Sequence, residues 1–146
     1  MNNVEIGVYS NAESRIAMDH WTQPFWEAGK EGRLMVPRCT SCSTFRLPPL
    51  PFCGACQSQG VDWINVPGRA ELFSYTVCHR KAISPDIPAM SYIPVVVEIP
   101  DAGGVRLMGN LIDVDLDKLR IGMPLDLFWH PIADGWRYPI FRPASV

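Results

Sequence analysis

Residues 39–56 read CTSCSTFRLPPLPFCGAC and place four cysteines in two pairs, Cys39 with Cys42 and Cys53 with Cys56. Two residues separate the members of each pair, which puts both sulfur atoms at one tight turn. Two such turns on a short hairpin close a tetrahedral cage of four sulfurs around one ion. The spacing therefore predicts a structural metal site in a ribbon, rather than four ordinary buried cysteines.

The identity of the ion follows less directly, because four thiolates accept either zinc or iron. Each pair is followed by a residue other than glycine, Ser43 or Gln57, where rubredoxins generally carry glycine. We therefore favour zinc and keep iron as the alternative. Four thiolates leave no open position for water or substrate, so we expect the ion to be structural and not catalytic.

The sequence before the cage predicts one short helix. Apolar residues recur at helical spacing within residues 19–30, with Thr22 as a candidate N-cap and with Gly29 and Gly32 marking the end. The aromatic side chains of this helix have two alternative roles, packing on the protein's own barrel or ribbon and burial by a partner. Residues 1–18 show no period, and we expect a loose arm without an assigned function.

After a break at residues 66–68 the hydrophobic period becomes that of a β-sheet. Five short strands with a helical turn between the third and the fourth fit a small closed barrel such as the OB-fold, and an open sandwich fits the same pattern. We expect a mainly β protein divided into an N-terminal arm and helix (1–36), a metal ribbon (37–65) and a barrel (66–146). The expected strands span residues 69–80, 92–99, 105–112, 125–130 and 138–142.

Composition argues against several classes of function. Apolar residues form 47% of the chain, which is enough for a packed core, and the net charge is −2. A protein that binds nucleic acid or anionic membranes usually has a basic surface, which this composition does not favour. The N-terminal residues lack the pattern of a secretory signal, and no run approaches the roughly 20 apolar residues of a membrane helix. We expect a cytoplasmic protein.

Several motifs in order resemble the DUF35 family: PFWEAGKEGRLMVPRCTSCSTFRLPP, FCGACQS, GRAELFSYTVCHR, VRLMGNLIDVD and LRIGMPLDLFW. The resemblance runs from about Trp21 to Pro143, and it departs from the family at Gly54, where members commonly have proline. It implies an N-terminal helix, a rubredoxin-like zinc ribbon and a C-terminal, five-stranded OB-fold. It also implies a small partner subunit of thiolase-like or acyl-CoA-processing enzymes, in pathways of lipid or aromatic-compound metabolism.

The function that this resemblance implies is accessory. We expect a hetero-oligomer in which the thiolase, aldolase or acyltransferase partner holds the catalytic residues, while this chain stabilises the complex and helps bind the CoA thioester. We assign it no catalytic residue and do not expect it to be catalytic alone. Two alternatives come from other classes: an OB-fold protein that binds single-stranded nucleic acid, and a rubredoxin-like electron carrier.

The clearest basic cluster comprises His79, Arg80 and Lys81, at the end of the first expected strand. Arginine and lysine bind phosphate, so these residues and Arg46 are our candidates for contact with CoA, and a solvated strand end is the plain alternative. Cys78 precedes the cluster. Adjacent strand residues point to opposite faces, so Cys78 and His79 are not expected to form a thiolate pair.

Overall fold

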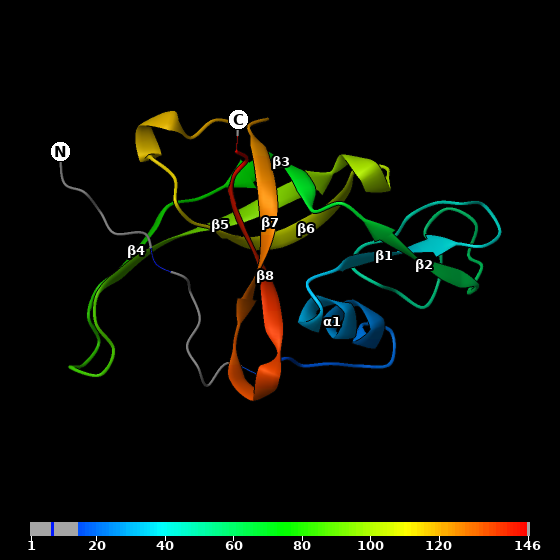
Figure 1. Cartoon of the computed structure of the whole chain (residues 1–146), viewed down its shortest axis with the longest axis horizontal. Coiled ribbons are helices and arrows are strands. Elements are labelled where there is room, and N and C mark those ends of the chain that lie inside the picture. The colour runs from blue at the N-terminus through cyan, green and yellow to red at the C-terminus, as the bar shows by residue number, and fades with distance from the viewer. Residues whose placement is uncertain (1–6, 8–14, 146) are drawn as a thin grey trace.

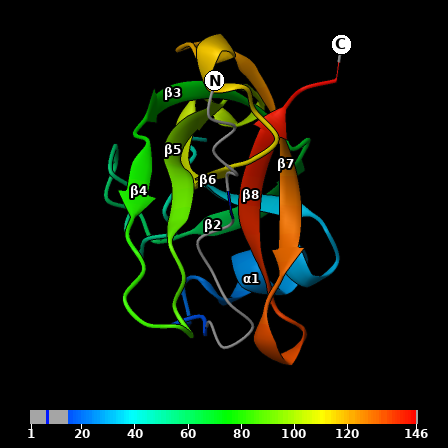
Figure 2. The same cartoon turned by 90° about the vertical axis from the view of Figure 1, so that its left-hand side faces the viewer.

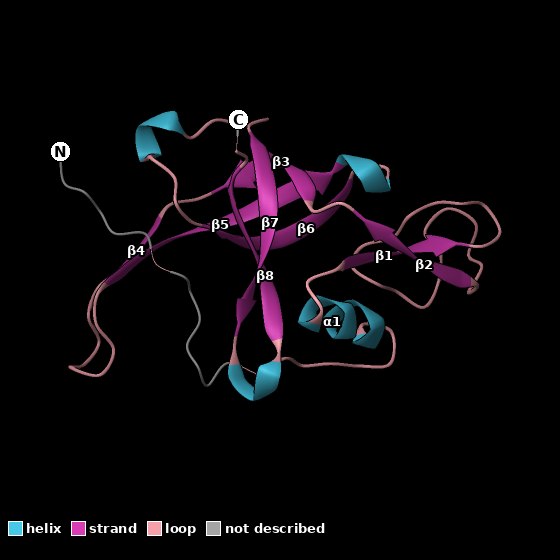
Figure 3. Ribbon diagram, viewed as in Figure 1, coloured by secondary structure: helices cyan, strands magenta, loops and turns pink. Residues whose placement is uncertain are grey.

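The computed structural model describes residue 7 and residues 15–145, and it consists of a helix, a two-stranded ribbon and a β-barrel (Figures 1 and 3). The expected arm, residues 1–18, lies mostly outside the described residues. Among those described, no helix has the length and apolar character needed to cross a membrane. The elements are α1 (Gln23–Lys30), β1 (Leu34–Cys39), β2 (Val61–Val66), β3 (Arg69–Tyr75), β4 (Cys78–Arg80), β5 (Met90–Ile99), η1 (Pro100–Ala102), β6 (Val105–Leu111), η2 (Leu116–Lys118), β7 (Pro124–Pro131), η3 (Ala133–Gly135) and β8 (Arg137–Pro143).

The barrel has the strand order β3-β7-β8-β6-β5, and a second pairing between β3 and β5 closes it. Strands β6 and β8 pair in parallel, and the remaining pairs are antiparallel. This arrangement is the closed barrel of the OB-fold, which confirms the expected fold class and excludes the open sandwich. Strand β4 extends the sheet beyond the barrel by pairing with the first residues of β5.

The first expected strand, residues 69–80, is divided in the structure into β3 and β4. The register of β3 against β5 shifts between Leu72 and Ser74, and the Thr76 N–H donates to the carbonyl of Pro94 (3.1 Å) where the two short strands meet. A bulge bends a strand and increases its twist. The chain therefore follows β5 along its whole length while the barrel curves.

The barrel core comes from strict alternation in β5 and from large apolar residues opposite it. Residues 93, 95, 97 and 99 of β5 are buried, and those between them are partly exposed. All five barrel strands contribute large apolar side chains with under 2% of their surface exposed. They include Leu72, Ile93, Ile99, Leu111, Leu125, Ile140 and Phe141.

Helix α1 connects the ribbon with the barrel. Phe25 is buried and packs edge-on against Trp129 of β7, with ring centroids 5.6 Å apart. Gly29 was expected to end the helix but lies inside it, where a methyl group would come within 2.5 Å of Cζ3 of Trp129. Close packing against Trp129 therefore requires glycine at position 29. Gly32, with φ of +75°, follows the helix as expected.

Strand β2 was not expected from the sequence. It pairs antiparallel with β1, with Val66 opposite Leu34 and Val61 opposite Cys39. All of its residues except Val66 are partly buried or exposed, because a two-stranded ribbon has little to cover it. The pairing carries the chain from the second cysteine pair back to the barrel, so it fixes the ribbon beside β3 (Figure 1).

Candidate metal centre and basic pocket

The first cysteine pair is held by a turn at the end of β1. The Cys39 backbone N–H donates to the carbonyl of Thr44 (2.9 Å), and the Ser43 N–H donates back to the carbonyl of Cys39 (3.0 Å). Ser43 has φ of 63°, in the left-handed region. This reversal brings the sulfur of Cys42 to the same side of the turn as the sulfur of Cys39.

The second pair repeats the turn. The Cys53 N–H donates to the carbonyl of Ser58 (2.8 Å), the Gln57 N–H donates to the carbonyl of Cys53 (3.0 Å), and Gln57 has φ of 62°. A left-handed conformation costs a residue other than glycine about 1–2 kcal/mol. Both turns adopt this conformation without glycine, so each one carries a conformational cost of this order.

The four sulfur atoms lie within 4.8 Å of one another. Cys39 Sγ lies 3.6 Å from Cys56 Sγ, and Cys42 Sγ lies 3.6 Å from Cys53 Sγ. A tetrahedral ion with metal–sulfur bonds of about 2.3 Å requires sulfur atoms about 3.8 Å apart, and a disulfide requires about 2.05 Å. The cysteines are free thiols at the spacing of metal ligands, so the residues present fit a four-coordinate ion.

The thiols of this cage differ in proton affinity. The hydroxyl of Thr44, 3.1 Å from the sulfur, lowers the pKa of Cys42 to about 6. The N–H of Ser58 lowers the pKa of Cys56, but interactions with the sulfurs of Cys42 and Cys39 outweigh it and raise this pKa to about 11. Protons therefore remain on part of the cage at neutral pH. A divalent cation must displace them, and binding weakens as the pH falls.

Arg46, one of the candidate CoA contacts, is turned into the ribbon. Its guanidinium donates to the carbonyls of Leu50 (3.0 Å) and Gly60 (2.9 Å), and its side chain is buried. These bonds join the loop between the cysteine pairs to the start of β2. They give Arg46 a structural role in the ribbon, and its contact with CoA stays a prediction.

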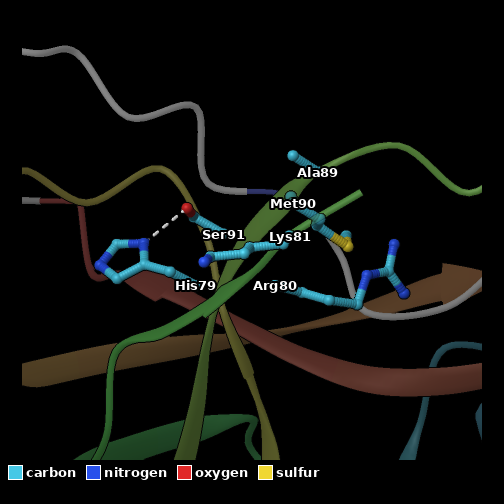
Figure 4. A pocket seen from close by; sticks show the side chains of 7 residues that line it. His79, Arg80, Lys81, Ala89, Met90 and Ser91 are labelled. Atoms are coloured by element: carbon cyan, nitrogen blue, oxygen red, sulfur yellow. Dashed lines mark hydrogen bonds between the residues drawn. The ribbon is translucent and has the colours of Figure 1, made fainter. Parts of the chain in front are cut away.

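The other three candidates line one pocket of about 520 Å³ at the β4–β5 strand pair, together with Gly7. Figure 4 shows His79 and Lys81 extending to one side of the strand pair and Arg80 to the other, as strand alternation requires. The His79 Nδ1 and the Ser91 hydroxyl are hydrogen-bonded at 2.8 Å. The lining residues are Gly7, His79, Arg80, Lys81, Ala89, Met90 and Ser91.

Sequence reasoning missed two residues of this pocket. Ser91 lies opposite His79 in the β4–β5 pairing, and Gly7 is held by hydrogen bonds to the Ser91 carbonyl (2.8 Å) and from the Asn110 side-chain amide (3.0 Å). No local pattern marks either residue, because strand register and a contact across 103 positions bring them there. Cys78 pairs with Tyr92 and is partly buried, apart from the lining residues.

The aromatic residues of α1 differ in burial. Phe25 is buried in the protein's own core, Trp26 is partly buried against that core, and both line an apolar groove of about 370 Å³. The opposite walls of this groove are Leu47 and Pro48 of the ribbon loop and Met108 of β6. Packing within the chain therefore accounts for Phe25.

Comparison with known proteins identifies the family. The model described as "ChsH2, rubredoxin-like zinc ribbon domain" matches residues 26–62, and "ChsH2, C-terminal OB-fold domain" matches residues 63–130. The solved structure "Ltp2-ChsH2(DUF35) aldolase" is 36% identical, covers 90% of this chain and 100% of that chain, and has a TM-score of 0.78. This chain belongs to the DUF35 family.

Two curated relatives are subunits of larger size. The "Probable enoyl-CoA hydratase alpha subunit" of Thermomonospora curvata is 40% identical over 123 residues. The "3-oxo-4,17-pregnadiene-20-carboxyl-CoA hydratase alpha subunit" of Mycobacterium tuberculosis is 30% identical over 119 residues. Each match covers 82% of this DUF35 chain but only 37% and 36% of the relatives. The chain thus spans little more than a third of the length of these two proteins.

Proposed function

We propose that this DUF35 protein is a non-catalytic, zinc-containing subunit that associates with a thiolase-like enzyme acting on acyl-CoA thioesters. The observation that carries the proposal is the match to the Ltp2-ChsH2(DUF35) aldolase, which extends over 90% of this chain and the whole of the matched chain. Both hydratase relatives are also named as subunits of enzymes that act on CoA compounds. A closed four-sulfur cage supports a structural role, because it offers no position for a substrate.

Zinc is the proposed ion, held by Cys39, Cys42, Cys53 and Cys56. Zinc has no redox chemistry and suits a tetrahedral site whose purpose is to hold a ribbon together. The division into arm and helix, ribbon, and barrel at residues 36 and 65 belongs to the same proposal. Elemental analysis of purified protein tests the ion: one zinc per chain in a colourless protein supports it, and a red protein containing iron supports the electron carrier instead.

We propose that the phosphates of the CoA thioester bind in the basic pocket. The same CoA thioester is also bound by the partner. His79 and Lys81 extend to the same side of the strand pair, and Ser91 adds a hydroxyl to the pocket lining. Lysine offers a point charge to phosphate, and a hydroxyl offers a hydrogen bond. The pocket supplies binding groups for an anion, and the reacting end of the thioester would lie in the partner.

Co-expression with the thiolase-like enzyme encoded nearest to this chain tests the subunit role. We expect the two proteins to copurify and to form a complex of defined stoichiometry. The partner should lose stability or turnover of its acyl-CoA substrate when this chain is omitted, and this chain alone should turn over none. If the two proteins elute separately and the enzyme behaves identically alone, the proposal is wrong.

A lysine substitution tests the shared CoA site within that complex. Lys81→Ala removes one charge from the pocket, and we expect the dissociation constant of CoA to rise about threefold to tenfold at low salt. The matched control is Lys118→Ala, an exposed lysine of η2 outside the pocket. Calorimetric titration with CoA measures both. If the two variants bind CoA with equal affinity, CoA does not bind in this pocket.

A further inference from the structure

The loop between β4 and β5 presents apolar side chains away from the rest of the molecule. Residues 81–89 are all exposed except Ser84, and the hairpin extends outward on the side opposite the ribbon (Figures 1 and 2). At its tip, Ile83 is 72% exposed and Ile87 is 40% exposed. Neither isoleucine belongs to this protein's hydrophobic core, so both side chains are available to a partner.

The tip is held in one shape by bonds within the hairpin. The Ile83 N–H donates to the carbonyl of Ile87 (3.0 Å), and the Ile87 N–H donates to the carbonyl of Ser84 (3.0 Å). The Arg80 guanidinium donates across the legs to the carbonyl of Pro88 (3.1 Å). A preorganised loop loses less conformational entropy when a partner covers it. The hairpin therefore has the character of a binding element.

The position of the hairpin indicates what covers it. Its two legs, residues 79–81 and 89–91, form the walls of the basic pocket. If the phosphates of a CoA thioester lie in that pocket, the thioester itself extends into the partner, because this chain contributes no catalytic group to the pocket. The partner's acyl-CoA channel would then open toward the side of the molecule that carries the hairpin.

We propose that Ile83 and Ile87 insert into an apolar cleft of the thiolase-like subunit, beside the mouth of its acyl-CoA channel. This inference rests on the proposed function. The tip has aliphatic side chains and one charged residue, Asp86, which is exposed between the two isoleucines. The matching surface is therefore an apolar cleft with a basic group at its rim. Such a rim is complementary to Asp86 and also suits a channel that admits an anionic CoA.

The test is the double variant Ile83→Ser and Ile87→Ser, with Ile121→Ser as the matched control. Ile121 is 60% exposed on the loop before β7, so both variants remove exposed isoleucine without opening the core. We expect the tip variant to bind the co-expressed thiolase-like subunit at least about tenfold more weakly, with or without CoA. Its zinc content and melting temperature should equal those of the unaltered chain, and Ile121→Ser should bind normally.

The outcomes separate this inference from the proposed function. If the unaltered chain binds the enzyme and the tip variant binds equally well, the inference is wrong and the subunit role stands. If the unaltered chain does not bind the enzyme at all, both are wrong. A third outcome is that the unaltered chain self-associates with rising concentration and that only the tip variant abolishes this. A second copy of this chain would then cover the hairpin tip, and the inference would be wrong.

Discussion

The ribbon and the barrel are ordered by different means within one chain. Between residues 40 and 60 only Arg46 and Cys53 are buried, and the loops on both sides of the cage are largely exposed. The barrel, by contrast, buries a contiguous set of large apolar side chains, of which Ile93, Leu111 and Phe141 have 0% of their surface exposed. The ribbon thus has a four-sulfur metal site in place of a core, whereas the barrel is held by the hydrophobic effect.

This difference shows how a short segment without a core becomes a rigid surface. Ordering about 20 residues costs roughly 1–2 kcal/mol each in backbone entropy, and two buried side chains offset little of it. Binding of a structural zinc ion supplies about 10–16 kcal/mol in zinc-finger peptides, and that binding energy is also folding energy. The two regions should therefore respond separately to loss of metal and to loss of core volume.

Removal of the metal should give the largest effect. In Cys53→Ser the cage loses a buried ligand, so we expect loss of the ion and of amide protection across residues 40–60, while the barrel strands stay protected. Residue-resolved hydrogen exchange and zinc analysis measure both, and Cys78→Ser, outside the cage, is the control. If the barrel amides lose protection together with the ribbon, the two regions form one cooperative unit and the comparison fails.

Loss of core volume should give the reverse pattern. Phe141→Ala removes a ring with 0% exposure from β8, and we expect the free energy of unfolding of the barrel to fall by about 3–5 kcal/mol. Phe128→Ala, at a 39% exposed position of the neighbouring strand, should cost no more than about 1 kcal/mol. Urea denaturation measures the difference. Zinc content should stay unchanged in both variants, and its loss in Phe141→Ala would contradict the separation.

The junction between the two regions should show an intermediate effect. In Gly29→Ala the added methyl group would lie 2.5 Å from the Trp129 ring. Overpacking of this kind costs about 1–3 kcal/mol, which exceeds the gain of about 1 kcal/mol in helix propensity. The melting temperature should therefore fall, whereas Gly54→Ala, with open space around the new methyl group, should leave it nearly unchanged. A Gly29→Ala protein of higher stability would mean that α1 moves away from Trp129 freely.

The sequence predicted best where a local pattern sets the structure. The cysteine spacing identified all four candidate ligands, because two short turns suffice to bring the sulfurs together. Alternation predicted the barrel strands closely: 105–112 was expected where β6 spans Val105–Leu111. Where packing between distant segments decides, the sequence did not reveal the structural reason for a residue. Gly29 looks like a helix terminator until Trp129 is placed against it, and β2 has too few buried residues to give a period.

The sequence predicted only part of the basic pocket. Its charged residues are adjacent in sequence and were therefore found as a cluster, whereas Ser91 and Gly7 required the strand pairing. The environment of Arg46 also lay beyond what sequence reasoning could show. Its charge alone does not reveal that the guanidinium is engaged by the carbonyls of Leu50 and Gly60. Charge can be counted along a chain, but exposure depends on the fold.

The smallest expected effect tests whether the cage or its side chains determine the two left-handed turns. Glycine removes about 1–2 kcal/mol of strain at a positive φ and costs about 0.5–1 kcal/mol in unfolded-state entropy. Ser43→Gly or Gln57→Gly should therefore stabilise the ribbon by up to about 1 kcal/mol, whereas Gln59→Gly, at a position without positive φ, should destabilise it slightly. Because ribbon stability is coupled to the ion, competition with a chelator gives the readout, and a gain of about 1 kcal/mol corresponds to roughly fivefold tighter zinc binding. Weaker binding in both turn variants would mean that the Ser43 and Gln57 side chains support the cage through contacts of their own, and that these contacts outweigh the strain of the turns.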